Sequence, residues 1–205
     1  MPDVELAMTP AERDLLDRAS SFARDVMAPA AAQWERERIA PASAFRTAAN
    51  CGLTTLSLPQ AQGGQGVTTV AAARLYEELS KTCFAFTFGL LVHNNVLRAM
   101  AQHGGSDVRD LHLSQMAEGS TVGAFCLTEP NAGSDAAAIE CVSRRVAGGW
   151  RINGEKAWVT NGRIATLLMV FAQTDRAKGW RGIASYLVPT SAEGVDRLPS
   201  YDLPG

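Results

Sequence analysis

The chain changes its hydrophobic pattern near Ser120, and this change limits the folds that it can adopt. Before this point, apolar residues recur at the spacing of helices that are buried on one side. From Thr121 onward, short apolar runs alternate with turn-forming residues, which is typical of strands. Helices followed by strands favour the α+β class. We therefore expect an all-helical N-terminal domain over residues 1–120 and an antiparallel β domain over residues 121–205.

The strongest local signal for a helix is the segment Thr9-Pro10-Ala11-Glu12. A threonine three residues before a glutamate, with proline at the first helical position, is a capping box that starts a helix. Pro29 lacks a backbone N–H group, so it should end or kink this helix. Further helices are expected over residues 42–50, from about 69, over 84–102, and from a cap at Ser106 to about 119. The segment 84–102 is apolar nearly all round and should be the central, buried helix.

The second part of the chain contains short runs with the composition of strands. They cover residues 122–127, 138–146, 150–152, 165–172 and 183–188. Gly148-Gly149 favours a tight hairpin turn between the second and third of these runs. We also expect Trp158 to lie at the end of a strand.

The composition argues against several classes of function. With a formal net charge of -2, the chain lacks the basic excess that favours nucleic acid. Its four cysteines lie far apart without a CxxC pair, so we expect reduced thiols and neither a disulfide nor a metal site. The longest uncharged apolar stretch, residues 83–92, is shorter than the ~20 residues that span a bilayer. The acidic, polar N-terminus does not look like a signal peptide, so we expect a cytoplasmic location.

Residues 128–135 form a polar, turn-rich segment directly after the first predicted strand. Pro130 fixes its own φ, and Gly133 allows a ligand to approach the backbone closely. The hydroxyl groups of Thr128 and Ser134, with the N–H groups of the loop, could bind the edge of a ring or a phosphate. A β-turn that carries polar side chains fits the same pattern. Likewise, Trp158 could stack on a flat heterocycle or be an ordinary half-buried strand tryptophan.

Several segments, taken in order along nearly the whole chain, resemble the acyl-CoA dehydrogenase family. They are residues 59–66, which match the family's P-x-x-x-G-G-x-G loop, then 76–80, 92–94, 128–135 and 154–162. The resemblance implies a helical N-terminal domain, a β-barrel middle domain and a C-terminal four-helix bundle, with FAD between the last two. On this basis the chain comprises the helical domain and an incomplete antiparallel β-barrel middle domain.

The resemblance also implies roles for individual residues. Carried over by position, the predicted cofactor-binding residues are Phe125, Leu127, Thr128, Trp158 and Thr160. Ser134 is implied to contact the acyl-CoA near its phosphopantetheine arm. Family members more often have tyrosine where Phe125 stands, so any hydroxyl contact from that position is lost. Asn131 replaces a more usual glycine, and because asparagine tolerates left-handed backbone angles, we expect the loop to keep its shape.

The activity that the resemblance implies is FAD-dependent α,β-dehydrogenation of an acyl-CoA thioester. A glutamate takes the α-proton while the β-hydrogen leaves as hydride. In the family this glutamate lies in the C-terminal bundle, which this chain lacks, and Glu129 is not the base. No catalytic residue is therefore predicted here, and we expect a fragment or one half of a split enzyme that is not active alone.

Two other interpretations stay open. The chain could be a non-catalytic subunit that needs a partner chain, or a related flavoprotein such as an acyl-CoA oxidase. The partners implied by the resemblance are an acyl-CoA substrate, an electron-transferring flavoprotein and further copies of the chain in the intact protein.

Overall fold

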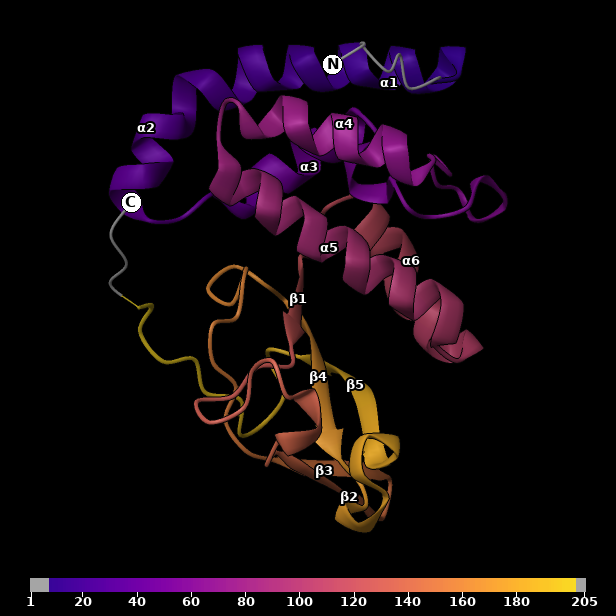
Figure 1. Ribbon diagram of the computed structural model, residues 1–205, viewed down its shortest axis with the longest axis vertical. Helices are drawn as coiled ribbons and strands as arrows, with labels where there is room; N and C mark the ends of the chain where they lie inside the picture. The colour runs from indigo at the N-terminus through magenta and orange to yellow at the C-terminus, as the bar shows by residue number, and fades with distance from the viewer. Residues whose placement is uncertain (1–7, 202–205) are drawn as a thin grey trace. The chain divides into compact units, whose positions relative to one another are not determined.

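The computed structural model describes residues 8–201 as a helical unit and a sheet unit, which divide between Val122 and Gly123 (Figure 1). The helical unit contains α1 (Pro10–Phe22), α2 (Ala28–Glu37), α3 (Ala42–Asn50), α4 (Thr69–Ser80), α5 (Phe84–His103) and α6 (Ser106–Ala117), with 3-10 turns at Leu53–Thr55 and Gln60–Gln62. The sheet unit contains β1 (Gly123–Cys126), β2 (Val142–Val146), β3 (Gly149–Asn153), β4 (Leu167–Gln173) and β5 (Ile183–Pro189), with 3-10 segments η4 (Ala136–Ala138) and η5 (Arg176–Gly182). The predicted α+β class is confirmed.

The predicted capping box is present at the start of α1. The Thr9 hydroxyl accepts a hydrogen bond from the Glu12 backbone at 3.2 Å, and the Glu12 carboxylate accepts one from the Thr9 backbone at 2.8 Å. The same carboxylate also accepts the backbone N–H and the hydroxyl of Thr68, both at 2.9 Å. The backbone N–H groups of Thr68 and Thr9, in that order, and then the Thr68 hydroxyl lower the pKa of Glu12 to about 2, although burial acts in the opposite direction. Because Thr68 is the N-cap of α4, one carboxylate joins the starts of two helices.

Pro29 changes the geometry of the first helical run without ending it. Ala23–Met27 form a π-helical turn, and α2 begins directly afterwards with Pro29 in its first turn. The π-helical turn just before Pro29 lets the helix continue although Pro29 has no backbone N–H group to donate. The two α-helices run in different directions on either side of this turn (Figure 1).

α5 is the central, buried helix of the helical unit, as the sequence predicts. The ring of Phe86 is 1% exposed and lies 5.8 Å from Phe22, 5.4 Å from Trp34 and 5.2 Å from Phe45, measured between ring centroids. These neighbours belong to α1, α2 and α3. One aromatic cluster therefore holds four helices together.

The start of α6 differs from the sequence prediction. Ser106 is the first helical residue rather than the cap, and Gly105 occupies the N-cap position without a side-chain hydrogen bond. An N-cap residue needs extended backbone angles, and Gly105 has them, with a ψ of 163°. The predicted serine cap is therefore wrong by one residue.

β4 is the central strand of the sheet unit. It pairs along its whole length with β5 in the antiparallel direction, and its first residues pair with β1 in the parallel direction. Its last residue, Gln173, pairs with Val142 of β2. β2 and β3 form the predicted antiparallel hairpin, with Gly148 at a φ of +83° in the turn.

The sheet is therefore mixed, whereas the sequence pattern led us to expect antiparallel strands throughout. Alternation of apolar and polar residues fixes which face a strand buries but not the direction of its neighbour. Parallel strands need a long crossover, and residues 127–166 between β1 and β4 supply one. Over residues 8–201 the strands do not close into a barrel.

Two further searches cover the part of the chain that the structure describes. Within residues 8–201, no helix is long and apolar enough to cross a membrane. No group of three or more His, Cys, Asp or Glu side chains in the same range is arranged to hold a metal ion. The cysteines Cys51, Cys83, Cys126 and Cys141 are free.

Because Phe86 belongs to the aromatic cluster and Phe84 does not, replacing each by alanine should change the free energy of unfolding by very different amounts. Phe86→Ala should lower the free energy of unfolding of the helical unit by about 3–5 kcal/mol, because it leaves a cavity among four helices. Phe84 is 68% exposed, so Phe84→Ala should change this free energy by less than about 1 kcal/mol. Urea unfolding followed by circular dichroism at the helical band measures both, and equal losses would contradict the proposed core.

His93 predicts that acid weakens the helical unit. Burial lowers the pKa of His93 from 6.5 to about 4, although the hydrogen bond of its Nε2 atom to the Met116 carbonyl, at 3.0 Å, acts in the opposite direction. Between these two values the unfolded chain binds a proton that the folded chain does not. The stabilisation is complete above pH 6.5 and should fall by about 3 kcal/mol as the pH approaches 4.

Urea titrations at several pH values test this dependence. His93→Gln, which keeps a donor for the Met116 carbonyl, should flatten the loss of stability between pH 6.5 and 4. His103→Gln changes an exposed histidine of the same helix and should keep the slope of the parent chain. The same slope in all three proteins would refute the role of His93.

Candidate functional site

The loop after β1 is closed by two backbone hydrogen bonds. Glu129 N–H donates to the Ala132 carbonyl at 2.8 Å, and Ala132 N–H donates to the Glu129 carbonyl at 3.3 Å. Pro130 and Asn131 form the tip, and Asn131 is not among the described residues with left-handed backbone angles. Asn131 therefore does not adopt the left-handed angle for which asparagine seemed suited. No described atom lies within 4 Å of the position that a Cβ on Gly133 would take, so the backbone there is accessible.

A buried ion pair lies behind this loop. Lys156 Nζ donates to the Glu129 carboxylate at 2.7 Å and to the Leu127 carbonyl at 3.0 Å. The lysine side chain is 9% exposed and the glutamate side chain 5%. The carboxylate also accepts the backbone N–H groups of Glu140 and Cys141. The ion pair thus joins three segments that are far apart in the sequence.

The protonation state of Glu129 follows from these contacts. Burial by itself raises the pKa of its carboxyl group. The hydrogen bond from Lys156, those from the Glu140 and Cys141 backbones, and the lysine charge together outweigh burial, so the pKa lies below its ordinary value. Glu129 is therefore ionised at neutral pH, and both of its carboxylate oxygens accept hydrogen bonds within the protein. This makes it a poor general base, because a base needs a free lone pair within reach of the proton that it abstracts.

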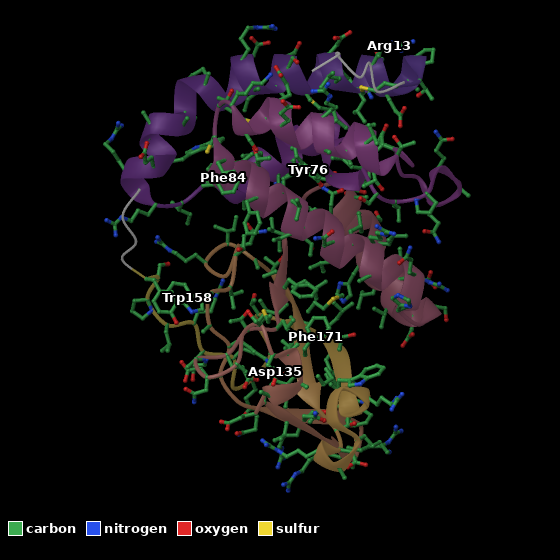
Figure 2. All side chains as sticks on the ribbon, in the orientation of Figure 1. Arg13, Tyr76, Phe84, Asp135, Trp158 and Phe171 are labelled. Carbon is green, nitrogen blue, oxygen red and sulfur yellow. The ribbon has the colours of Figure 1, made fainter. Side chains whose placement is uncertain are left out.

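Trp158 stands at a bend and not at the end of a strand, as we had expected. Its φ is +57°, a left-handed angle that is uncommon for a large side chain and ends any extended run. The sequence prediction was wrong because the segment after β3 leaves the sheet at Asn153. Trp158 is 57% exposed, and Figure 2 shows it at the surface of the sheet unit. Its ring stacks on Tyr201, with centroids 4.1 Å apart and planes 17° apart.

Residues 156–161 run along β1 and its extension. Asn161 Nδ2 donates to the Gly123 carbonyl at 3.1 Å at one end. Ala157 N–H donates to the Thr128 carbonyl at 2.8 Å at the other end. Residues 123–128 and 157–161 therefore lie side by side in opposite directions, although more than one whole hairpin separates them in the sequence.

This arrangement brings most of the predicted site residues together. Phe125 lies in β1 between two core-facing neighbours, and its ring contacts Phe171 of β4 at 4.7 Å between centroids. Leu127 and Thr128 follow one and two residues after β1, so the strand ends sooner than predicted. Trp158 and Thr160 lie on the adjacent segment. Ser134 is exposed further along the loop, and no hydrogen bond between described residues joins it to the others.

The polar groups of the predicted site are available to a ligand. Among the described residues, no hydrogen bond uses the hydroxyl groups of Thr128, Ser134 or Thr160. Asp135, next to Ser134, is engaged instead, because its carboxylate accepts the Ala137 N–H at 3.0 Å and starts η4 (Figure 2). The site thus combines unpaired hydroxyls with an exposed aromatic ring.

Sequence reasoning did not predict a role for Lys156 or Tyr201. A lysine two residues before an aromatic residue gives no sign that it is buried, and its partner Glu129 is far away in the sequence. Asn161 was part of a recognised segment, but its bond to β1 could not be anticipated. The sequence offered one indication that Lys156 has a special role, which is that it is the single charged residue of the segment 156–162.

Comparison with known proteins decides the family. Residues 9–120 match the family described as "Acyl-CoA dehydrogenase, N-terminal domain", and residues 124–205 match "Acyl-CoA dehydrogenase, middle domain". This chain belongs to the acyl-CoA dehydrogenase family. The resemblance found in the sequence is thereby confirmed.

Similar proteins show how much of a relative's length this chain covers. The human mitochondrial short-chain specific acyl-CoA dehydrogenase is 34% identical over 182 residues, covering 88% of this chain and 44% of the human protein. Acryloyl-CoA reductase (NADH) of Anaerotignum propionicum is 31% identical, covering 95% and 50%. A glutaryl-CoA dehydrogenase of Mycobacterium smegmatis in complex with FADH2 is 28% identical with a TM-score of 0.84, covering 94% and 48%. The chain therefore spans about half the length of the relatives that it matches.

Because its ion pair is buried, Lys156 should contribute strongly to the stability of this acyl-CoA dehydrogenase middle domain. Lys156→Met leaves the Glu129 carboxylate buried without a counter-ion and should lower the free energy of unfolding by about 3–5 kcal/mol. The matched control is Lys178→Met, because Lys178 pairs with Asp175 at 3.2 Å while its side chain is 66% exposed. This control should cost less than about 1 kcal/mol. Urea unfolding of the sheet unit measures both, and equal costs would contradict the ion pair's importance.

Proposed function

We propose that the sheet unit presents one wall of an FAD site and that the protein to which this chain belongs dehydrogenates an acyl-CoA thioester. The observation that carries the proposal is the convergence of Phe125, Leu127 and Thr128 with Trp158 and Thr160 along one pair of adjacent segments. A flavin is flat, aromatic and rimmed by hydrogen-bonding atoms. It suits an exposed ring beside unpaired hydroxyls.

The residues of this site fit a flavin in two respects. Trp158 already stacks on one planar ring, that of Tyr201, so its indole accepts a parallel partner. Thr128 and Thr160 offer hydroxyl donors on the two adjacent segments. The relative in complex with FADH2 supports the same cofactor.

The division of labour in the reaction follows from the chemistry of the groups. When bound, the flavin accepts the β-hydrogen as hydride. Phe125, Leu127, Thr128, Trp158 and Thr160 would hold and orient it, and Ser134 would contact the acyl-CoA. Glu129 does not suit the role of base, because both of its carboxylate oxygens are held by hydrogen bonds and its side chain is only 5% exposed. We therefore propose that the base comes from a segment or chain beyond these residues.

The wider setting is also part of the proposal. We propose an electron-transferring flavoprotein as the acceptor of the electrons and an oligomer of identical subunits for the intact protein, both by analogy with the family. A cytoplasmic location remains a prediction from the sequence.

Titration of the chain with FAD tests the proposal. Saturable binding should quench tryptophan fluorescence and shift the visible absorbance of the flavin. Trp158→Ala should weaken binding roughly tenfold, because it removes the stacking surface. Trp180→Ala removes a tryptophan that is 66% exposed on η5, outside the site, and should leave affinity unchanged. Failure of the folded parent chain to bind FAD would refute the proposed site.

Addition of an acyl-CoA to the FAD-loaded chain tests the missing base. The flavin absorbance should persist, because the buried carboxylate of Glu129 is held by Lys156 and by the backbone N–H groups of Glu140 and Cys141. Bleaching of the flavin by the acyl-CoA would contradict this and would place a working base within the chain.

A further inference from the structure

We infer that the Glu129–Lys156 ion pair positions the two flavin-facing residues Thr128 and Trp158, which makes both charged residues positioning residues for cofactor binding. This inference rests on the proposed function, since it assumes that the wall formed by Thr128 and Trp158 receives FAD. It assigns a task to a buried pair that the reaction itself does not use.

The first step of the argument is the position of the pair relative to the site. Thr128 directly precedes Glu129, and Trp158 follows Lys156 by two residues. Between them, Ala157 N–H donates to the Thr128 carbonyl at 2.8 Å. Thr128 is therefore adjacent to one member of the ion pair and Trp158 lies two residues from the other, and a backbone hydrogen bond ties the two segments together between them.

The second step is the unfavourable backbone conformation of Trp158, which contacts of the ion pair can stabilise. Trp158 has a left-handed φ of +57°, which is unfavourable for a large side chain and persists only where neighbouring contacts hold it. Lys156 supplies such contacts two residues earlier, through the Leu127 carbonyl at 3.0 Å and Glu129 at 2.7 Å. The lysine thus anchors the segment at the start of the bend that turns the Trp158 ring toward solvent.

The third step is the polarity of the pair, which the surrounding backbone fixes. Position 129 must be an acceptor, because the N–H groups of Glu140 and Cys141 both point at its carboxylate. Position 156 must be a donor, because the Leu127 carbonyl faces its ammonium group. If the pair served only to neutralise charge, a lysine at position 129 and a glutamate at position 156 would serve equally well. The reversed pair should not, since it would set a lysine against two N–H groups and a carboxylate against a carbonyl.

The test uses NMR of the isotope-labelled chain together with FAD titration. Lys156→Met should shift the indole N–H signal of Trp158, assigned from its loss in Trp158→Phe, and the backbone amide of Thr128. It should weaken FAD binding by about tenfold or more, as loss of a supporting contact behind a binding group commonly does. Lys178→Met, at the exposed pair of the same unit, should change neither signal nor affinity.

Two further variants separate positioning from simple stability. Lys156→Arg keeps the charge and the donors, so it should fold and should bind FAD more tightly than Lys156→Met. The exchange Glu129→Lys with Lys156→Glu should not restore binding or the Trp158 signal. Affinities are compared at a low temperature at which circular dichroism shows each variant folded. If Lys156→Met does not fold there, Lys156→Gln, which keeps a donor but removes the charge, takes its place in the comparison with Lys156→Arg.

The outcomes are distinct. Parent-like FAD affinity and Trp158 signals in folded Lys156→Met, or in folded Lys156→Gln if Lys156→Met does not fold, would overturn the inference while leaving the proposed function intact. Restoration by the charge exchange would also overturn it. If the parent chain does not bind FAD but Lys156→Met still shifts the Trp158 and Thr128 signals, the proposed function fails and the positioning of these residues stands.

Discussion

The ammonium group of Lys156 lies where water hardly reaches it, and the chain around it is arranged to compensate that charge. An uncompensated charge in such a place is costly, and a buried pair is tolerated only when further hydrogen bonds satisfy both partners. Here the Leu127 carbonyl serves the lysine, and the backbones of Glu140 and Cys141 serve the carboxylate of Glu129. Three loops of the sheet unit therefore converge on one point. The exposed ring of Trp158 and the turn after β1 depend on this convergence.

The helical unit uses a related device. The carboxylate of Glu12 completes the cap of α1 and also receives Thr68 at the start of α4. Asn94 acts similarly within the core, donating to the Leu53 and Leu90 carbonyls and accepting from Leu56 N–H. In both units aromatic and aliphatic packing holds the regular elements together. Buried polar side chains with several backbone partners then set the paths of the connecting segments.

The accuracy of sequence reasoning varied with the distance over which the relevant forces act. The capping box at Thr9 and the hairpin turn at Gly148 were predicted correctly, because each depends on residues within four positions. The N-cap of α6 was misplaced by one residue, because Gly105 takes the extended backbone angles of an N-cap without making a side-chain hydrogen bond. The parallel pairing of β1 with β4 could not be predicted, because nothing in either strand records the direction of a partner so far away in the sequence.

For the site, family motifs in the sequence led to the prediction that Phe125, Thr128 and Trp158 contact a flavin, and this stays a proposal. They could not show that Trp158 stands at a left-handed bend, or that Lys156 is buried against Glu129. Residue types, caps and periodicity are local properties, and the amino-acid order alone specifies them. The burial of a charge and the exposure of a ring are different, because they depend on segments that meet only after the chain has folded.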